Sequence, residues 1–362
     1  MGGAARAAHP GASHQPCFRG TEMLRYLLRR LAISAITVVG LVLVVFLVVR
    51  ILPGDAAAAR LGPEATQEDI DALRTRMGLD QPIWVQLGDY LAGLVRGDLG
   101  TAISTGRPVA DELFARLPAT VELALGGLVI ALLVGFPLGM LAASRRGRAS
   151  DVVARLFAVL GSSMAPVWLG LLLIYGLYSL AGLFPGPVGR LPIGTSPPTP
   201  ITGLYVLDGL LTGNVAAVGQ ALRALALPAL TLGLGASAAV LKMVRSAMIA
   251  TEDAGFARTA RAYGVPRREV LWRDRLRNAM LQVLTAIGLV IGFLLGGNVI
   301  VERLFSWPGM GRVAFDALGS NDLELLQGYA LIVGVVYIAL NLAVDLMYGA
   351  IDPRIRLGGR AA

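Results

Sequence analysis

The stretch QGYALIVGVVYIALNLAVDLMYGAI, residues 327–351, decides the fold, because only one of its 25 residues, Asp345, is charged. A helix needs about 20 predominantly apolar residues to cross a hydrocarbon core of about 30 Å. The stretch therefore predicts a transmembrane helix.

Five similar stretches precede it: residues 31–52, 119–143, 152–181, 222–244 and 279–301. Hydrophobic residues make up 55% of the 362 residues and charged residues only 15%, and the mean hydropathy is +0.67. This composition excludes an ordinary soluble domain and indicates a polytopic membrane protein. We predict an all-α fold with six transmembrane helices. Pro228, Gly233 and Gly235 interrupt the apolar run of the fourth, and neighbouring helices would have to tolerate them.

Arginine clusters orient these helices. The clusters precede the first stretch and follow the second, fourth and sixth: Arg25, Arg29, Arg30; Arg145, Arg146, Arg148; Arg245, Arg258, Arg261, Arg267, Arg268, Arg273, Arg275, Arg277; Arg354, Arg356. If the spans alternate, all four clusters lie on one side, which the positive-inside rule makes cytoplasmic. Both termini are predicted to be cytoplasmic, and the net charge of +8 reflects this bias rather than a nucleic-acid partner.

The predicted organisation has four parts. Residues 1–22 form a disordered tail or result from a mis-set start, 23–118 hold the first transmembrane helix and a long extracytoplasmic loop, 119–356 form a five-helix core, and 357–362 form a C-terminal tail. Both histidines and the only cysteine fall in the first part. Three such residues in a flexible tail are too few for a metal site, so none is predicted.

The extracytoplasmic loops carry local signals. In the first loop, Thr66 can cap a helix that starts near Gln67, and Pro82 suits the first turn of another. Residues 182–221 are rich in proline and glycine, which favours irregular chain. Residues 307–311, Trp-Pro-Gly-Met-Gly, predict a tight turn.

Catalytic chemistry is not supported. A phosphate-binding G-x-x-x-x-G-K-[ST] loop needs a Gly-Lys step, whereas the only lysine is Lys242, between Leu241 and Met243. No histidine lies outside the tail to serve a catalytic triad. We predict a chain that is not an enzyme, has no catalytic residue and no cofactor, and depends on another chain or an ion gradient for energy.

The arginine-rich segment 252–278 lies between two apolar stretches. Thr251 can cap a helix that begins there, and Phe256, Ala260 and Tyr263 then share one face. A small residue between two aromatic ones would allow a partner to approach closely.

The segment should turn sharply at Gly264, since glycine can adopt the left-handed conformation that closes a helix. Pro266 suits the first turn of a second short helix, in which Glu269 can pair with Arg273. The residues alone leave two roles open, docking of a partner protein or binding of anionic lipid.

This segment resembles the cytoplasmic EAA loop of ABC-importer permeases, in which E-A-A is followed after three residues by a glycine. Here Arg258-Thr259-Ala260 occupies the E-A-A positions and Gly264 that of the glycine. The form R-T-A-R-A-x-G, followed by Arg-Asn-Ala at 277–279, is similar to the dipeptide and oligopeptide subfamily. Further strings fit the subfamily: LLRRL at 27–31, ILPGD at 51–55, GLDQP at 78–82, RGDLG at 96–100, TGRPV at 105–109, RLPAT at 116–120, FSWPGMG at 305–311 and DPRIR at 352–356. The chain departs from the pattern at Gln282, where the family usually has a proline, so the kink expected there is in question.

The resemblance implies a type I ABC-importer permease in a bacterial cell membrane, which it crosses several times. The chain would form half of a pore for di- or oligopeptides, with a second homologous permease chain, two ABC ATPase subunits and an extracytoplasmic solute-binding protein. Residues 251–279 would be the hairpin that couples to the ATPases. Its candidate contact residues are Phe256, Arg258, Thr259, Ala260, Arg261, Tyr263, Gly264 and Pro266.

Polar residues in or near the spans are candidates for the solute path: Ser162, Ser163, Asn298, Asn341 and Asp345. Asp345 is at least as able to pair with Arg245 or Arg155 as to contact solute. We expect a wide, weakly selective channel.

Alternatives remain open. Similar permeases import nickel complexes or glutathione. An ion-coupled secondary transporter would need an ion-coupling carboxylate or broken helices in mid-membrane, and repeats between its halves. A membrane scaffold would transport nothing.

Overall fold

A computed structural model describes the backbone of residues 19–51, 56–61, 65–76, 78–192, 194–252, 254–296 and 298–351. These residues are mostly helical, with one isolated β-bridge between Thr101 and Pro108. Most of both predicted tails, including His9, His14 and Cys17, lies outside the described residues.

Four helical stretches are long and apolar enough to cross a membrane. They are Leu28–Ile51, Val109–Ser144, Val215–Ala250 and Leu323–Val344. The first lies in α1 (Arg19–Ile51), the second combines α5 (Val109–Phe114) with α6 (Leu117–Ser144), the third is α10, and the fourth lies in α16 (Leu323–Ile351). Two further spans exist if each of two bent helix pairs counts as one.

The third predicted span, 152–181, is wrong as a single straight helix. It is divided into α7 (Ala149–Ser163), α8 (Pro166–Leu173) and a π-helical end, η1 (Ile174–Leu180), and the chain turns by 106° at the break. Pro166 is the physical reason, since a proline disfavours helical backbone at the residue before it. Ala165 is accordingly extended, with φ −64° and ψ 138°.

The fifth predicted span, 279–301, ends early. α13 (Leu276–Gly296) stops before position 301, and Asn298 begins a separate helix, α14 (Asn298–Leu304). At its other end α13 continues from α12 (Arg267–Glu269) through a π-helical turn, η2 (Val270–Arg275). A 52° bend separates Val270–Met280 from Gln282–Gly296, so the kink forms without the family's proline.

The 36-residue helix α10 is the centre of the packing. It runs unbroken through Pro228, Gly233 and Gly235, so these residues are tolerated within the predicted span. Glycines let α6 approach it closely: a Cβ atom at Gly135 would lie 2.6 Å from the carbonyl oxygen of Ser237, and one at Gly139 would lie 2.8 Å from Cβ of Val244. Only small residues permit this separation of helix backbones.

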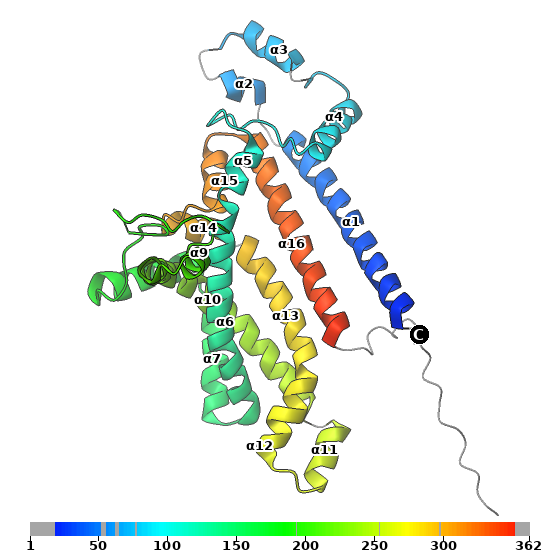
Figure 1. Cartoon of the computed structure of the whole chain (residues 1–362), viewed down its shortest axis with the longest axis vertical. Coiled ribbons are helices and arrows are strands. Elements are labelled where there is room, and N and C mark those ends of the chain that lie inside the picture. The colour runs from blue at the N-terminus through cyan, green and yellow to red at the C-terminus, as the bar shows by residue number, and fades with distance from the viewer. Residues whose placement is uncertain are drawn as a thin grey trace, which may run out of the picture.

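The opposite ends of the molecule differ in structure (Figure 1). The short helices α2 (Ala56–Leu61), α3 (Gln67–Arg76) and α4 (Ile83–Val95) lie at one end, and α11 (Gly255–Ala262) and α12 lie at the other. Between them α1 lies beside α16. The predicted cap of α3 is confirmed by a 3.3 Å hydrogen bond from the Asp69 N–H to Thr66 Oγ1. Pro82 is the N-cap of α4 rather than a residue of its first turn.

The proline-rich loop 182–221 is more ordered than its composition predicts. It contains α9 (Tyr205–Leu211) and leads into α10. Arg190, which is buried, donates to Glu122 of α6 over 2.6 Å and lies 3.5 Å from the ring centroid of Tyr205. This ion pair and ring contact hold the loop against α6.

The turn predicted at residues 307–311 packs against the start of α6. Its Trp307 is only 1% exposed and donates through Nε1 to the carbonyl of Ala119 over 2.8 Å. The turn leads into α15 (Met310–Gly319), which packs on α14 and α16.

Candidate functional site

The segment 251–279 forms the end of the molecule that lies farthest from α2 to α4 (Figure 1). Its first helix, α11, starts at Gly255, later than predicted. Thr251 does not cap α11. It is the C-cap of α10, and its hydroxyl donates to the carbonyl of Met248 over 2.8 Å. The polar side chain therefore satisfies the end of the helix that precedes it.

The turn at Gly264 is confirmed. Gly264 has φ +77°, in the left-handed region. The N–H of Val265 donates to the carbonyl of Ala260 over 3.1 Å, which is the longer bond of a Schellman ending. No described heavy atom would lie within 4 Å of a Cβ at Gly264, so only the backbone conformation requires glycine.

The second helix of the segment is not a separate short helix. The carbonyl of Pro266 accepts from the N–H groups of Glu269 and Val270, and the helix continues through η2 into α13. Glu269 and Arg273 form the predicted ion pair, 3.2 Å apart. The part of the segment that follows Gly264 is therefore continuous with the membrane helix α13.

The face formed by Phe256, Ala260 and Tyr263 is open to solvent at both aromatic positions. Tyr263 is 84% exposed and Phe256 40% exposed, while Ala260 is partly buried. Ala257, by contrast, is fully buried against the rest of the molecule. We call Phe256, Ala260 and Tyr263 the docking face.

Other predicted contact residues surround this face. Arg258 and Thr259 are exposed, and Arg261 lies in α11 with a side chain outside the described part of the structure. A shallow hollow lies nearby, lined by Pro266, Arg268, Glu269 and Trp272. The surface thus presents aromatic and cationic side chains together.

Arg275 ties η2 to the end of α10. Its guanidinium donates to the carbonyl of Met248 over 2.7 Å and lies 3.8 Å from the carboxylate of Glu252. Through Arg275, a displacement of η2 would therefore affect α10 as well as α13.

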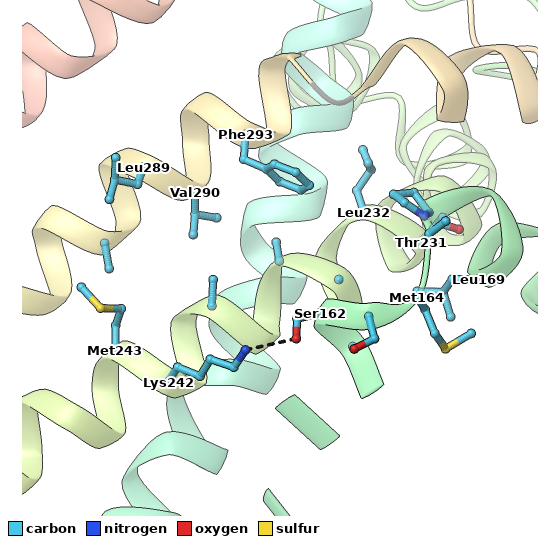
Figure 2. Close-up of a pocket in the computed structure, with 18 residues that line it drawn as sticks. Ser162, Met164, Leu169, Thr231, Leu232, Lys242, Met243, Leu289, Val290 and Phe293 are labelled. Atoms are coloured by element: carbon cyan, nitrogen blue, oxygen red, sulfur yellow. Dashed lines mark hydrogen bonds between the residues drawn. The ribbon is translucent and has the colours of Figure 1, made fainter. Parts of the chain in front are cut away.

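A cavity of about 670 Å³ lies among the break between α7 and α8, the middle of α10, and α13 (Figure 2). Ser162 and Ser163, both predicted solute-path residues, line it at the break. Aliphatic and aromatic side chains of α13, including Leu289 and Phe293, form another wall. Its size lies within the range of about 300–1,000 Å³ that is typical of small-molecule sites.

Lys242 of α10 is the only charged side chain among the described residues that line this cavity. Its ammonium donates to Oγ of Ser162 over 3.1 Å, as Figure 2 shows. Ser162 in turn donates to the carbonyl of Val159 over 3.1 Å. The break in the third span thus presents a hydroxyl to a cation of the neighbouring helix.

The other predicted solute-path residues do not gather at this cavity in the described structure. The Asn341 amide donates to the carbonyl of Tyr337 within α16. Asn298 begins α14 and Asp345 lies in α16, both with side chains outside the described part. The suggested partners of Asp345 instead contact Asp151, with Arg245 at 2.7 Å and Arg155 at 3.7 Å.

Two cavity residues were not predicted from the sequence. From the sequence, Lys242 was considered only as the lysine of a phosphate-binding loop, for which it lacks the preceding glycine. A charge within an apolar stretch is nevertheless a functional candidate by default. Thr231 also lines the cavity, but its hydroxyl donates to the carbonyl of Leu227 over 2.9 Å. No sequence signal distinguishes such a helix-bonded threonine from a packing residue.

A buried acid organises the side of the molecule away from α11. Glu302 accepts from the Thr120 hydroxyl over 2.7 Å and from the Arg312 N–H over 3.0 Å, and Thr120 accepts from the N–H of Met310 over 2.8 Å. Burial raises the pKa of Glu302 to about 7, and these hydrogen bonds partly oppose the rise. The cluster joins α6, α14 and α15. Among the described residues, no three histidine, cysteine or acidic side chains gather as metal ligands.

Comparison with known families covers most of the chain. Residues 135–357 match the family described as binding-protein-dependent transport system inner membrane component, and residues 23–124 match the N-terminal region of such components.

Curated relatives match over nearly their whole length. The chain is 42% identical over 324 residues to the probable D,D-dipeptide transport system permease protein DdpB of Escherichia coli (strain K12), which covers 90% of this chain and 95% of the relative. It is 35% identical to the dipeptide transport system permease protein DppB of Alkalihalophilus pseudofirmus, over 92% of this chain and 100% of the relative. It is 36% identical to the glutathione transport system permease protein GsiC of Salmonella choleraesuis, over 92% of this chain and 99% of the relative.

Among solved structures, a chain of the MetNI methionine ABC transporter in an inward-facing conformation is similar. The TM-score is 0.47 and the identity 16%, over 65% of this chain and 93% of that one.

Proposed function

Since this chain belongs to the family of binding-protein-dependent transport system inner membrane components and is an ABC-importer permease subunit, we propose that it carries di- or oligopeptides. The observation that supports this most is its 42% and 35% identity to permeases of dipeptide systems over at least 90% of its length. The cavity beside α10 then serves as part of the solute path.

The proposed arrangement has six spans with both termini in the cytoplasm. The two bent pairs each count as one span, α7 with α8 and η1, and η2 with α13. The cytoplasmic side then carries α11, and the extracytoplasmic side carries α2 to α4 and α9. Residues 23–118 supply the first span and the large outer loop, and 119–356 supply the core. The membrane is the bacterial inner or plasma membrane.

The proposed complex contains a second permease chain, two ATPase subunits and an extracytoplasmic binding protein. The docking face would contact an ATPase, because it exposes aromatic side chains beside a small residue. Such a surface is more typical of an interface than of a solvated helix. The neighbouring arginines Arg258 and Arg261 would face acidic groups of the ATPase.

Continuity between α12, η2 and α13 supports a mechanism for coupling. α11 is joined by a tight turn to this helix, and Leu289, Val290 and Phe293 of α13 line the cavity. A rigid-body shift of α11 on ATP binding would move one wall of the solute path, and so shift the pore between two packings.

The ion-coupled alternative gains one feature from the structure, the break between α7 and α8. Membership of a binding-protein-dependent family outweighs it, because the match covers residues 135–357 and 23–124. The scaffold alternative predicts that the chain purifies without ATPases, whereas we expect two ATPases and a second permease to co-purify.

Glutathione is a second candidate solute, favoured by the 36% identity to GsiC. Competition in cells separates the two: uptake of a labelled dipeptide through the complex is measured against excess unlabelled tripeptide, glutathione or a nickel complex. Inhibition by peptides alone supports the proposal. Entry of labelled glutathione or of a labelled nickel complex through the complex, with no entry of labelled dipeptide, would reassign the solute.

A further inference from the structure

Lys242 lies near one end of the predicted fourth span, residues 222–244, in the part of α10 that lines the cavity. The helix ends at Ala250, eight residues further on, which corresponds to about 12 Å along the axis. A charged side chain within an apolar span or at its edge is costly unless it faces a partner, water or a ligand. The direction of the Lys242 side chain therefore matters, and Figure 2 shows it extending into the cavity towards Ser162.

Two other cations of the chain are paired with acids, but within the described residues Lys242 is not. Arg245, one turn along α10, lies 2.7 Å from Asp151, and Arg190 lies 2.6 Å from Glu122. Lys242 instead contacts the neutral hydroxyl of Ser162. An ammonium has three N–H donors, so the contact with Ser162 leaves it able to bind an anion in the cavity.

The cavity suits a class of molecules that share one anionic group and differ in their other side chains. Its other walls are apolar and include Leu289, Val290 and Phe293, while the hydroxyl of Ser162 contacts the lysine. Apolar walls discriminate weakly between side chains, whereas a lysine recognises charge. A terminal carboxylate is the one charged group with this sign that unmodified linear peptides share.

We propose that Lys242 binds the terminal carboxylate of the peptide as it passes through the cavity, which rests on the proposal that the solutes are peptides. The site attracts the part that different peptides have in common. The channel can thus remain tolerant of side chains while holding each solute in one orientation.

The chain has one lysine, and this permits a direct test. The purified complex in neutral phosphatidylcholine vesicles is treated with an amine-acetylating reagent, and acetylation of Lys242 is measured by mass spectrometry. Alanylalanine should protect Lys242, and its C-terminal amide should not. Equal protection by the amide, or none by the free peptide, would overturn the proposal. So would protection by phosphatidylglycerol vesicles without peptide and no further effect of peptide, which would assign the site to a lipid headgroup.

Transport by variants gives the second test, at subsaturating dipeptide in the complete complex. Lys242→Met should lower uptake roughly tenfold or more, as expected for loss of a hydrogen bond to a charged group, and Lys242→Arg should retain it within about twofold. Arg223→Met is the matched control, because it removes an exposed cation of α10 outside the cavity lining. Normal uptake by Lys242→Met, or an equal loss in Arg223→Met, would refute the carboxylate site but not the proposed function. A wild-type complex that moves no peptide with ATP would instead refute the proposed function.

Discussion

Gly264 fixes the turn that ends α11, the helix that carries the proposed docking face. Its φ of +77° closes α11, and no described neighbouring atom restricts a side chain there. We predict that Gly264→Val strains the turn by about 1–2 kcal/mol or more, displaces α11, and lowers both peptide uptake and peptide-stimulated ATP hydrolysis about tenfold. Uptake and ATPase rates are compared at equal membrane levels of the permease.

Gly147 provides a matched control for Gly264→Val. It lies between α6 and α7 with φ +78°, and a Cβ atom there would likewise have no described heavy atom within 4 Å. Gly147→Val introduces the same backbone strain away from the docking face. If both variants lose coupling equally, strain rather than docking explains the effect.

A larger side chain at Ala260 tests whether the docking face contacts an ATPase. Ala260→Leu adds three carbons between Phe256 and Tyr263, so it should weaken ATPase association without unfolding the permease. Ala262→Leu is the same change on an exposed position of the same helix, about 200° away around the helix. Co-purification of the ATPases should fall for the first variant only, and a loss in both would contradict the assigned face.

Glu302 predicts a pH dependence of stability. Burial raises its pKa from 4.5 to about 7 in the folded protein. The folded state therefore holds the proton more tightly than the unfolded state, and this contribution is complete below pH 4.5 and is lost as pH rises through 7. The difference corresponds to about 3 kcal/mol at most.

The expected result is that the thermal stability of the wild type falls relative to that of Glu302→Gln between pH 5 and 8. Asp316→Asn, which removes the exposed partner of Arg303, should not change the wild-type pH dependence. A constant difference between wild type and Glu302→Gln over this range would contradict the raised pKa of Glu302.

At the scale of helices, the close contact of α6 with α10 depends on glycine. A Cβ at Gly135 would lie 2.6 Å from the Ser237 carbonyl oxygen. We predict that Gly135→Leu destabilises the protein by about 1–3 kcal/mol through overpacking. Gly219→Leu is the control, because Gly219 lies in α10 with open space around it. Detergent-solubilised stability is the measurement, and equal values for both variants would show that the helices do not pack this closely.

Helices were predictable from the sequence where apolar length alone decides them. α6 and α16 nearly coincide with predicted spans, while α1 and α10 cover residues 31–51 and 222–244 but begin earlier. About 20 apolar residues leave few other structures. The break at Pro166 was not predicted because the third span was identified from its hydropathy. Hydropathy takes no account of the rule that a proline disfavours helical backbone at the residue before it. Pro228 shows the converse, since α10 accommodates a proline that the same rule treats as a probable break.

Parts of the candidate site were also predictable. Gly264 and the Glu269–Arg273 pair follow from rules that act within a few residues, and the structure has both. The Arg190–Glu122 pair and the Lys242–Ser162 contact join residues 68 and 80 positions apart. Such contacts depend on how helices pack, which periodicity in one sequence does not determine.

At the scale of the whole molecule, the cavity and the docking face are linked by one continuous path of helix. α12, η2 and α13 run from the turn at Gly264 to the cavity wall at Leu289 and Phe293. In the proposed complex, a movement of α11 by an ATPase subunit would therefore change the shape of the cavity.

The most direct measurement is dipeptide uptake into proteoliposomes that contain this chain, its partner permease, the ATPases and the binding protein. We predict uptake that requires ATP hydrolysis, continues when ionophores collapse all ion gradients, and is absent when this chain is omitted. Uptake that stops with the ionophores but continues without ATP would contradict the account.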